Sequence, residues 1–378
     1  MIDLHRHILG SLLLAAATAT AAACPFCTAL RPTLSQRRET AAVVALGECD
    51  STSQGQATFR LHQILKGERL LSDRQRLTIS TDEALRPGSL ALLFAADADA
   101  PVRGMLTWQL ERINEAGYAY FAKAPLLRAP TAERLAYFAR YLEHPEPLVA
   151  EDAFNEFGHA AYDQAAPATR SISSEKLQAW LVDPRVPAGR KGFYGLALGL
   201  ARDDAGRAKN IDFLRALVVQ PADDFRAGFD GILGGYLVAG GEPALKTIED
   251  RFLLNPAAAD GDLRHVVGAL RFYWEYGRDI PPQRLRAAMR RLLSRPEFAA
   301  AAVVDLARWQ DWQALDAVAA LYTKDPPPVA ATRRAIVGYL LACPDSRAAE
   351  ELQRLRRQDP DGVQRAEQPL SILGIGDR

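Results

Sequence analysis

The chain has 378 residues, of which 48% are hydrophobic and 24% are charged, and this composition argues against both a disordered chain and a multi-spanning membrane protein. Lys and Arg together number 46, as do Asp and Glu, so the chain has no net positive charge with which to attract nucleic acid. The length is sufficient for two or three domains.

Residues 1–23 are predicted to be a secretory signal peptide. Arg6 lies in a short polar start, an apolar run follows at residues 8–17, and residues 21–23 form an Ala-Ala-Ala cleavage site. The alternative is a buried N-terminal helix, but Ala and Thr stand where such a helix would need larger packing side chains. The apolar run is too short to cross a bilayer. We therefore expect export to the periplasm or the extracellular space, with no transmembrane span.

Cys24, the first residue after this segment, has a second interpretation. Residues 21–24 (Ala-Ala-Ala-Cys) are similar to the lipobox of bacterial lipoproteins, although Ala21 stands where that motif usually has Leu. Lipidation of Cys24 would anchor the protein to a membrane, whereas an unmodified Cys24 would leave it free.

Three of the four cysteines lie close together, at Cys24, Cys27 and Cys49. In an oxidising compartment this spacing favours a local disulfide, most simply between Cys49 and one of the other two. A redox C-x-x-C motif would need a strand before Cys24, and a zinc site with His62 would need a second C-x-x-C. Cys343 lies on the apolar face of a predicted helix, where we expect a buried, unpaired thiol.

Residues from about 40 to 125 alternate with a period of two, as β-strands do. The clearest run is 57–65, and others lie at 42–46, 77–79, 90–94 and 106–110. A connection at 114–117 followed by Tyr118 and Tyr120 is predicted to complete a hairpin. Five or six short strands within 90 residues indicate a small barrel or sandwich, and we assign residues 24–125 to this β domain.

From Pro130 the period becomes helical. Prolines recur at intervals of 30 to 40 residues, most of them between two amphipathic stretches, at positions 145, 184, 221, 256, 296, 326 and 360. The repeating unit is thus a pair of helices that cannot bury its apolar face alone, which predicts a stacked solenoid over residues 126–365 and a tail at 366–378. A closed helical bundle is the alternative, because the spacing is irregular and residues 228–241 are rich in Gly.

The helical region resembles HEAT-type repeats, through residues 183–186 (Asp-Pro-Arg-Val) and Asp325-Pro326 followed by Val329 and Arg333. This resemblance implies a binding scaffold. The β region resembles the netrin-like, or tissue-inhibitor-of-metalloprotease-like, barrel of the OB class, through its early cysteines and residues 59–67 and 87–94. The fold class implied is a small OB-like barrel followed by a HEAT-like α-helical solenoid.

Residues 24–27 (Cys-Pro-Phe-Cys), this barrel and residues 152–158 together are similar to exported bacterial proteins of unassigned function. In the inhibitor family, the N-terminal Cys of the mature protein binds a protease zinc through its amine and carbonyl, and cleavage after Ala23 would place Cys24 there. The family has one residue between its first two cysteines, whereas this chain has Pro25 and Phe26.

The acidic segment that contains Asp152, Asn155 and Glu156 is a candidate site. Glu156 and His159 have the Glu-x-x-His spacing of di-iron bundles, but no second copy exists. The sequence favours a solvated acidic face or a helix cap over an ion site, and Asp152, Asn155 and Glu156 are also candidates for the partner-facing surface of the first repeat.

A second charged cluster consists of five arginines, at positions 284, 286, 290, 291 and 295. Such a cluster can bind phosphate or form a solvated helix face, and the apolar residues between these arginines favour the solvated face.

No nucleophile elbow, phosphate loop, dinucleotide fingerprint or His-Glu-x-x-His motif occurs in the sequence. We therefore expect no catalytic residue, no cofactor and no metal, although a carboxylate-based enzyme would leave no sequence signal. The function predicted is non-enzymatic binding of other proteins. The alternatives are a secreted regulator that inhibits a metalloprotease through the barrel, and a C-x-x-C redox protein.

Overall fold

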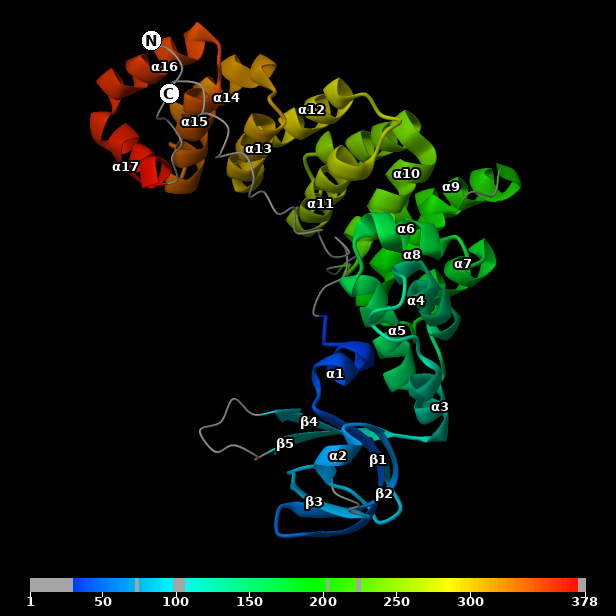
Figure 1. Cartoon of the computed structure of the whole chain (residues 1–378). Helices are drawn as coiled ribbons and strands as arrows, with labels where there is room; N and C mark the ends of the chain where they lie inside the picture. The colour runs from blue at the N-terminus through cyan, green and yellow to red at the C-terminus, as the bar shows by residue number, and fades with distance from the viewer. Residues whose placement is uncertain (1–29, 72–74, 98–105, 202–203, 222–225, 373–378) are drawn as a thin grey trace, which may run out of the picture. The chain divides into compact units, whose positions relative to one another are not determined.

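The computed structural model describes residues 30–71, 75–97, 106–201, 204–221 and 226–372 (Figure 1). A five-stranded antiparallel sheet is followed by many helices, so the mixed architecture agrees in outline with the prediction. By its internal contacts the chain divides into two units, Met1–Ser173 and Ser174–Arg378. Among the described residues, no helix combines the length and the apolar character needed to cross a membrane.

The sheet of the first unit has the strand order β3-β2-β1-β4-β5, with β1 in its centre. Its five strands correspond to the five clearest alternating runs: β1 (Val43–Ser53), β2 (Gln56–Lys66), β3 (Arg76–Ser80), β4 (Leu90–Asp97) and β5 (Leu106–Ile113). Along β2, Ala57 and Phe59 are buried while Arg60 is exposed, as period-two alternation requires. In the described part of the chain, β3 and β5 are the edge strands.

The predicted hairpin at residues 114–120 is wrong, because this segment forms helix α3 (Glu115–Lys123). The side chain of Asn114 accepts a hydrogen bond from the backbone N–H of Gly117 at 2.8 Å and so caps the helix. Tyr120 and Phe121 are both buried although they are adjacent, which a strand with one covered face does not allow.

The other helices of the first unit lie before, within and after the sheet. They are α1 (Leu34–Thr40), α2 (Glu68–Leu71), α4 (Thr131–Phe138), η1 (Ala139–Tyr141), α5 (Pro147–His159) and α6 (Tyr162–Thr169). Helix α1 begins at a capping box in which Thr33 and Gln36 bond each other's backbone N–H groups. The ring of Tyr120 stacks on that of Tyr137, which helps to fix α3 against α4.

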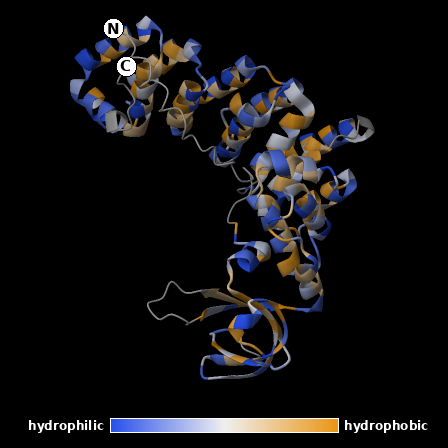
Figure 2. Cartoon of the chain, in the orientation of Figure 1, coloured by the Kyte–Doolittle hydropathy of each residue, from blue (hydrophilic) through white to orange (hydrophobic). Residues whose placement is uncertain are grey.

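The second unit is entirely helical in its described residues. Its elements are α7 (Ser174–Val182), α8 (Ala188–Leu200), α9 (Asp204–Val219), α10 (Phe229–Ile248), η2 (Glu249–Leu253), α11 (Asp260–Tyr276), α12 (Pro282–Arg290), η3 (Arg291–Ser294), α13 (Pro296–Arg308), η4 (Trp312–Ala314), α14 (Leu315–Tyr322), α15 (Ala330–Ala342), α16 (Ser346–Gln358) and α17 (Pro360–Ile372). Pro296 and Pro360 are the first residues of their helices, as predicted. Helix α17 continues past residue 366, where the tail was predicted to begin. Figure 2 shows hydrophobic and hydrophilic residues on the same helices, as amphipathic packing requires.

Helices α8 and α10 pack backbone against backbone because glycines meet at their contact. A Cβ placed on Gly199 would lie 2.1 Å from the carbonyl oxygen of Gly235, and one on Gly231 would lie 2.2 Å from that of Gly192. Gly192 meets Gly231, and Gly199, later in α8, meets Gly235, later in α10. The two helices therefore run parallel.

Many other contacts in the second unit join residues about one proline interval apart. Hydrogen bonds join Arg271 to Asp305, which is 34 residues further on, and Arg284 to Glu249, 35 residues before it. Arg226 is bonded to Asp262 at a separation of 36 residues. Helix α13 packs on α15, and α15 packs on α17, so alternate helices are neighbours in space.

Candidate functional site

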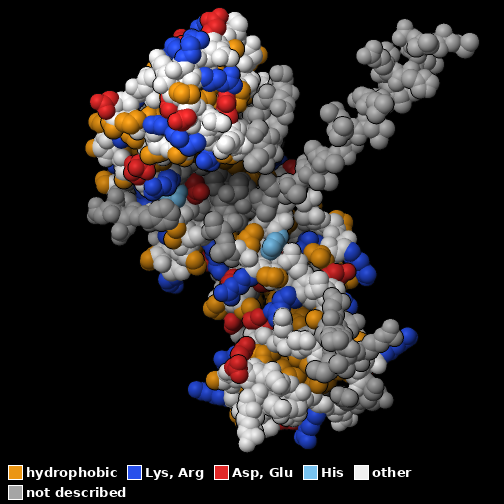
Figure 3. Space-filling model, turned by 90° about the vertical axis from the view of Figure 1, so that its left-hand side faces the viewer, with side chains coloured by type: hydrophobic (Ala, Val, Ile, Leu, Met, Phe, Trp, Pro, Cys, Tyr) orange, Lys and Arg blue, Asp and Glu red, His pale blue; other side chains and the backbone are white. Residues whose placement is uncertain are grey.

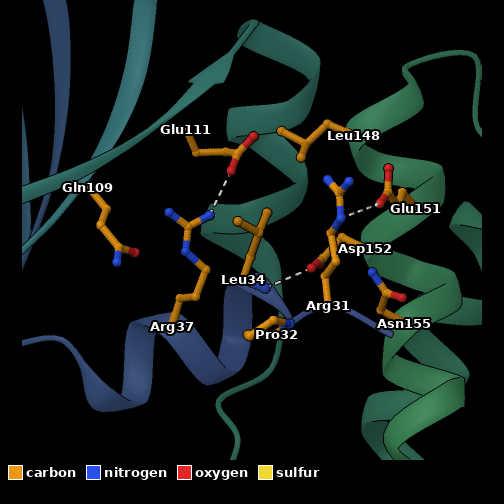
Figure 4. A pocket seen from close by; sticks show the side chains of 10 residues that line it. All are labelled: Arg31, Pro32, Leu34, Arg37, Gln109, Glu111, Leu148, Glu151, Asp152 and Asn155. Atoms are coloured by element: carbon orange, nitrogen blue, oxygen red, sulfur yellow. Dashed lines mark hydrogen bonds and ion pairs between the residues drawn. The ribbon is translucent and has the colours of Figure 1, made fainter. Parts of the chain in front are cut away.

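A pocket of about 460 Å³ lies in the first unit between α1, β5 and α5 (Figure 4). This volume falls in the usual range of small-molecule sites. The residues that line the pocket come from these three elements and from the segment before α1: Arg31, Pro32, Leu34, Arg37, Gln109, Glu111, Leu148, Glu151, Asp152 and Asn155. Two of the residues predicted to form an interaction surface, Asp152 and Asn155, are therefore brought together here.

Asp152 fixes the start of α1 to α5. Its carboxylate accepts hydrogen bonds from the backbone N–H of Leu34 at 2.7 Å and from the hydroxyl of Tyr120 at 2.6 Å. Burial raises the pKa of Asp152 to about 7, because the surroundings disfavour the charged form more strongly than these donors favour it. The carboxyl group is therefore part protonated near neutral pH.

The chain immediately before α1 lies along the end of α5. Leu30 packs on Gly158, where a Cβ would lie only 2.2 Å from the Leu30 side chain. The ring nitrogen Nε2 of His159 lies 2.9 Å from the carbonyl oxygen of Arg31. These contacts hold Arg31 and Pro32 over α5, where they form one wall of the pocket.

Two arginine–glutamate pairs flank the pocket. Arg37 donates to Glu111 at 2.7 Å, and its guanidinium also lies 4.3 Å from the centre of the Phe94 ring. Arg31 and Glu151 lie farther apart, at 3.7 Å, and the Arg31 side chain is 78% exposed. Because a loose, exposed pair contributes little energy, Arg31 can turn to another partner at small cost.

Asn155 is only 6% exposed, yet no described residue hydrogen-bonds to its side-chain amide. Figure 4 shows this amide beside Asp152 and Arg31 at the wall of the pocket. The atoms of this amide are not among the fully buried polar atoms without a partner, so solvent in the pocket reaches them, and they can donate to and accept from a molecule there.

Glu156 lies away from the pocket and forms a buried ion pair with Arg134. The solvated face is wrong for Asp152 and Glu156, because neighbouring elements cover the polar side of α5 as well as its apolar side, whereas Asp152 does bond the first N–H of helix α1. Glu156 and His159 bind different partners. No group of three or more metal-binding side chains occurs among the residues that the structure describes.

The first two cysteine candidates, Cys24 and Cys27, lie outside the described residues. Cys49 is a buried free thiol of β1 in the part of the chain that is described, and burial raises its pKa. The predicted disulfide of Cys49 therefore stays a prediction. Cys343 is a buried free thiol at the end of α15, as expected.

The arginine cluster of α12 and η3 is not simply a solvated face. Four of its five side chains contact groups outside their own helix: Arg284 with Glu249, Arg286 with the Trp309 carbonyl, Arg290 with Asp311, and Arg295 with the Asn255 and Pro256 carbonyls. These acceptors lie in earlier or later parts of the chain, 21 to 40 residues away, which the local sequence pattern does not reveal. Over the whole face of the molecule that Figure 3 shows, Lys and Arg side chains are interspersed with Asp and Glu side chains.

A second candidate surface lies on the second unit and was missed at the level of sequence. Val182, Val219 and Leu254 are exposed by 59%, 42% and 50%. Each of them stands two residues before one of the recurring prolines, at positions 184, 221 and 256, so the three share one position relative to these prolines. We call these three residues the aliphatic row. The available signal was an apolar residue two positions before the three consecutive prolines at positions 184, 221 and 256, which the other recurring prolines lack.

Comparison of the chain with protein-family models, with curated proteins and with solved structures gave no match. In its described residues the chain combines a small antiparallel sheet, many helices, a pocket lined by charged side chains in the first unit, and three exposed aliphatic side chains in the second.

Proposed function

We propose that the protein is an exported, non-enzymatic scaffold that binds another protein through its helical-repeat surface. The observation that carries this proposal is the aliphatic row, since three exposed apolar side chains recur at equivalent positions. Single exposed apolar residues are ordinary on a protein surface, whereas apolar residues that together form one patch mark an interaction site, and we propose that the aliphatic row is such a patch.

The proposal includes a HEAT-like solenoid over residues 126–365. It is supported by the parallel packing of α8 on α10 and by polar contacts between residues 34 to 36 positions apart. Contacts at one fixed separation are what stacked repeats produce, because equivalent positions of neighbouring units touch. For residues 24–125 we propose a netrin-like barrel, and for residues 1–23 an export signal.

The proposed partner presents aliphatic side chains at a matching interval. Neighbouring packed helices lie about 8–10 Å apart, so the aliphatic row extends over about 20 Å. A helical or extended segment of another protein can span this length. Burying the exposed parts of three such side chains would contribute about 1 kcal/mol each, which is less than the cost of association, so the proposed complex also needs contacts around the row.

Site-specific crosslinking in the intact source cell tests this proposal. A photo-crosslinking amino acid at position 219 should yield one discrete adduct, whereas the same group at Val304, which is 36% exposed on α13 outside the row, should not. The captured protein should then bind the purified full chain, and Val219→Glu should weaken its binding at least tenfold while Val304→Glu does not. Equal adducts at both positions, or unchanged binding by Val219→Glu, would rule out the row as the binding surface.

A further inference from the structure

We propose that the pocket between α1, β5 and α5 binds a ligand in which a free α-ammonium group stands next to a carbonyl. Two sources share this chemistry, a free amino acid and the amino end of a peptide. The proposal does not depend on the scaffold function, because its residues all lie in the first unit and the aliphatic row lies in the second.

The ammonium group fits beside Asp152. The two hydrogen bonds that this carboxylate accepts leave a free lone pair on each oxygen, and no described cation is hydrogen-bonded to it. The guanidinium of Arg37 is close enough to lower the pKa of Asp152, but it is already paired with Glu111. A ligand ammonium would supply the counter-charge that this buried carboxylate lacks, with Glu151 of the same helix as a second acceptor.

The carbonyl fits beside Asn155. This side chain is more than nine-tenths buried, faces the pocket and has no hydrogen-bond partner among the described residues. Its amide nitrogen can donate to the carbonyl or carboxylate of a ligand. Arg31 stands on the same wall, is loosely paired and mostly exposed, and can add a charged donor.

The balance of charge around the pocket favours a ligand that carries an ammonium group over an anion. Arg31 and Arg37 offset Glu111 and Glu151, and the ionised carboxylate of Asp152 is then left for the ammonium group of the ligand. Leu34 completes the wall with an apolar surface that can receive a small side chain. The volume of about 460 Å³ admits a single amino acid or the first two residues of a peptide.

Binding of this ligand requires ionised Asp152. The titratable and charged groups that face Asp152 are Tyr120 on α3, Tyr137 on α4, Glu156 on its own helix and Arg37 on α1. With its pKa near 7, the fraction of Asp152 that is ionised rises about eightfold between about pH 6 and about pH 7.5. The affinity for an ammonium ligand should rise by the same factor.

Calorimetric titration of the purified full chain at about pH 7.5 tests the ligand class. The probes are L-alanine, L-alanyl-L-alanine and N-acetyl-L-alanyl-L-alanine, which lacks the ammonium group. Binding of L-alanine identifies a free amino acid as the ligand, and binding of the dipeptide alone identifies a peptide end. In either case the acetylated dipeptide should bind at least tenfold more weakly. Equal binding of the acetylated form, or no binding of any probe at about 10 mM, overturns the proposal.

Two variants locate the binding in the pocket. Asn155→Ala should weaken binding at least tenfold, whereas Asn210→Ala, which changes a buried asparagine of the second unit bonded to Ser174, should leave it unchanged. Asp152→Asn should weaken binding at about pH 7.5 at least tenfold and should remove the rise in affinity between about pH 6 and about pH 7.5. Unchanged affinity in a folded Asn155→Ala variant would refute the placement, and if that variant does not fold, the comparison of free and acetylated probes still decides the proposal.

Discussion

Adding one methyl group at Gly199 tests how closely α8 and α10 approach each other. The new Cβ would lie 2.1 Å from the carbonyl oxygen of Gly235 and 2.5 Å from its Cα. These atoms belong to the backbone, so no rotamer change can remove the overlap. The two helices would have to separate by about 1 Å, and over such a gap a packed contact loses a quarter to a half of its dispersion energy.

The expected loss of stability follows from two opposing contributions. Alanine is favoured over glycine inside a helix by about 1 kcal/mol, which stabilises the variant. Overpacking of a closely fitted contact costs about 3 kcal/mol or somewhat more, because the whole length of both helices is displaced. Gly199→Ala should therefore lower the free energy of unfolding by about 2–3 kcal/mol, which corresponds to a fall of about 5–10 °C in Tm for a unit of this size.

Thermal unfolding followed by circular dichroism measures this effect. The matched control is Gly189→Ala, in the first turn of the same helix α8, where a Cβ would meet no atom within 4 Å. The control should be as stable as the natural chain or up to about 1 kcal/mol more stable. If Gly199→Ala also keeps or raises the Tm, the close packing of α8 on α10 is refuted.

Two further predictions concern buried carboxylates. The pKa of Asp152 in the folded protein is about 7, above its ordinary value of 3.8. Between these two pH values the folded state holds a proton that the unfolded state has lost. The free energy of unfolding should therefore fall by up to about 4 kcal/mol from about pH 4 to about pH 7. Urea denaturation across this pH range measures the free energy of unfolding, and its fall with pH should be absent in Asp152→Asn. An equal fall with pH in both proteins would contradict the assignment to Asp152. Asp311→Asn removes the carboxylate that is bonded to Arg290 and should cost about 2 kcal/mol, because Arg290 stays partly buried without its partner. The control Asp316→Asn, at a carboxylate that is 87% exposed, should change stability by less than about 0.5 kcal/mol, and an equal loss in both variants would contradict the assignment.

The sequence was most informative where one local pattern determines one element. The alternation around Phe59 predicts β2 because a strand with one covered face must bury every second residue. Pro296 and Pro360 mark helix starts, since proline lacks the N–H that a first turn leaves unbonded. For α3 the same reasoning failed, because Tyr118 and Tyr120 alternate by chance and the cap at Asn114 was interpreted as a turn.

The pocket could be found only in part. Asp152 and Asn155 were candidates because of their residue types, but Arg37 and Glu111, which form the opposite wall, lie 74 residues apart in sequence and were not connected to them. The bond from Leu34 to Asp152 spans 118 residues and uses a backbone N–H, a group that every residue except proline possesses. No side-chain pattern can indicate such a partner.

The sequence pattern of α5 does not show that its acidic residues are buried, and the reason is general. An amphipathic pattern shows that a helix has one apolar face, but it does not show whether a second element covers the polar face. On α5 that second cover is the chain around Leu30, which Gly158 admits by having no side chain. Once this cover is in place, Asp152 must find donors within the protein, and it finds them in Leu34 and Tyr120. Asn155 finds none among the described residues, and the proposed ligand site rests on this difference between two neighbouring polar residues.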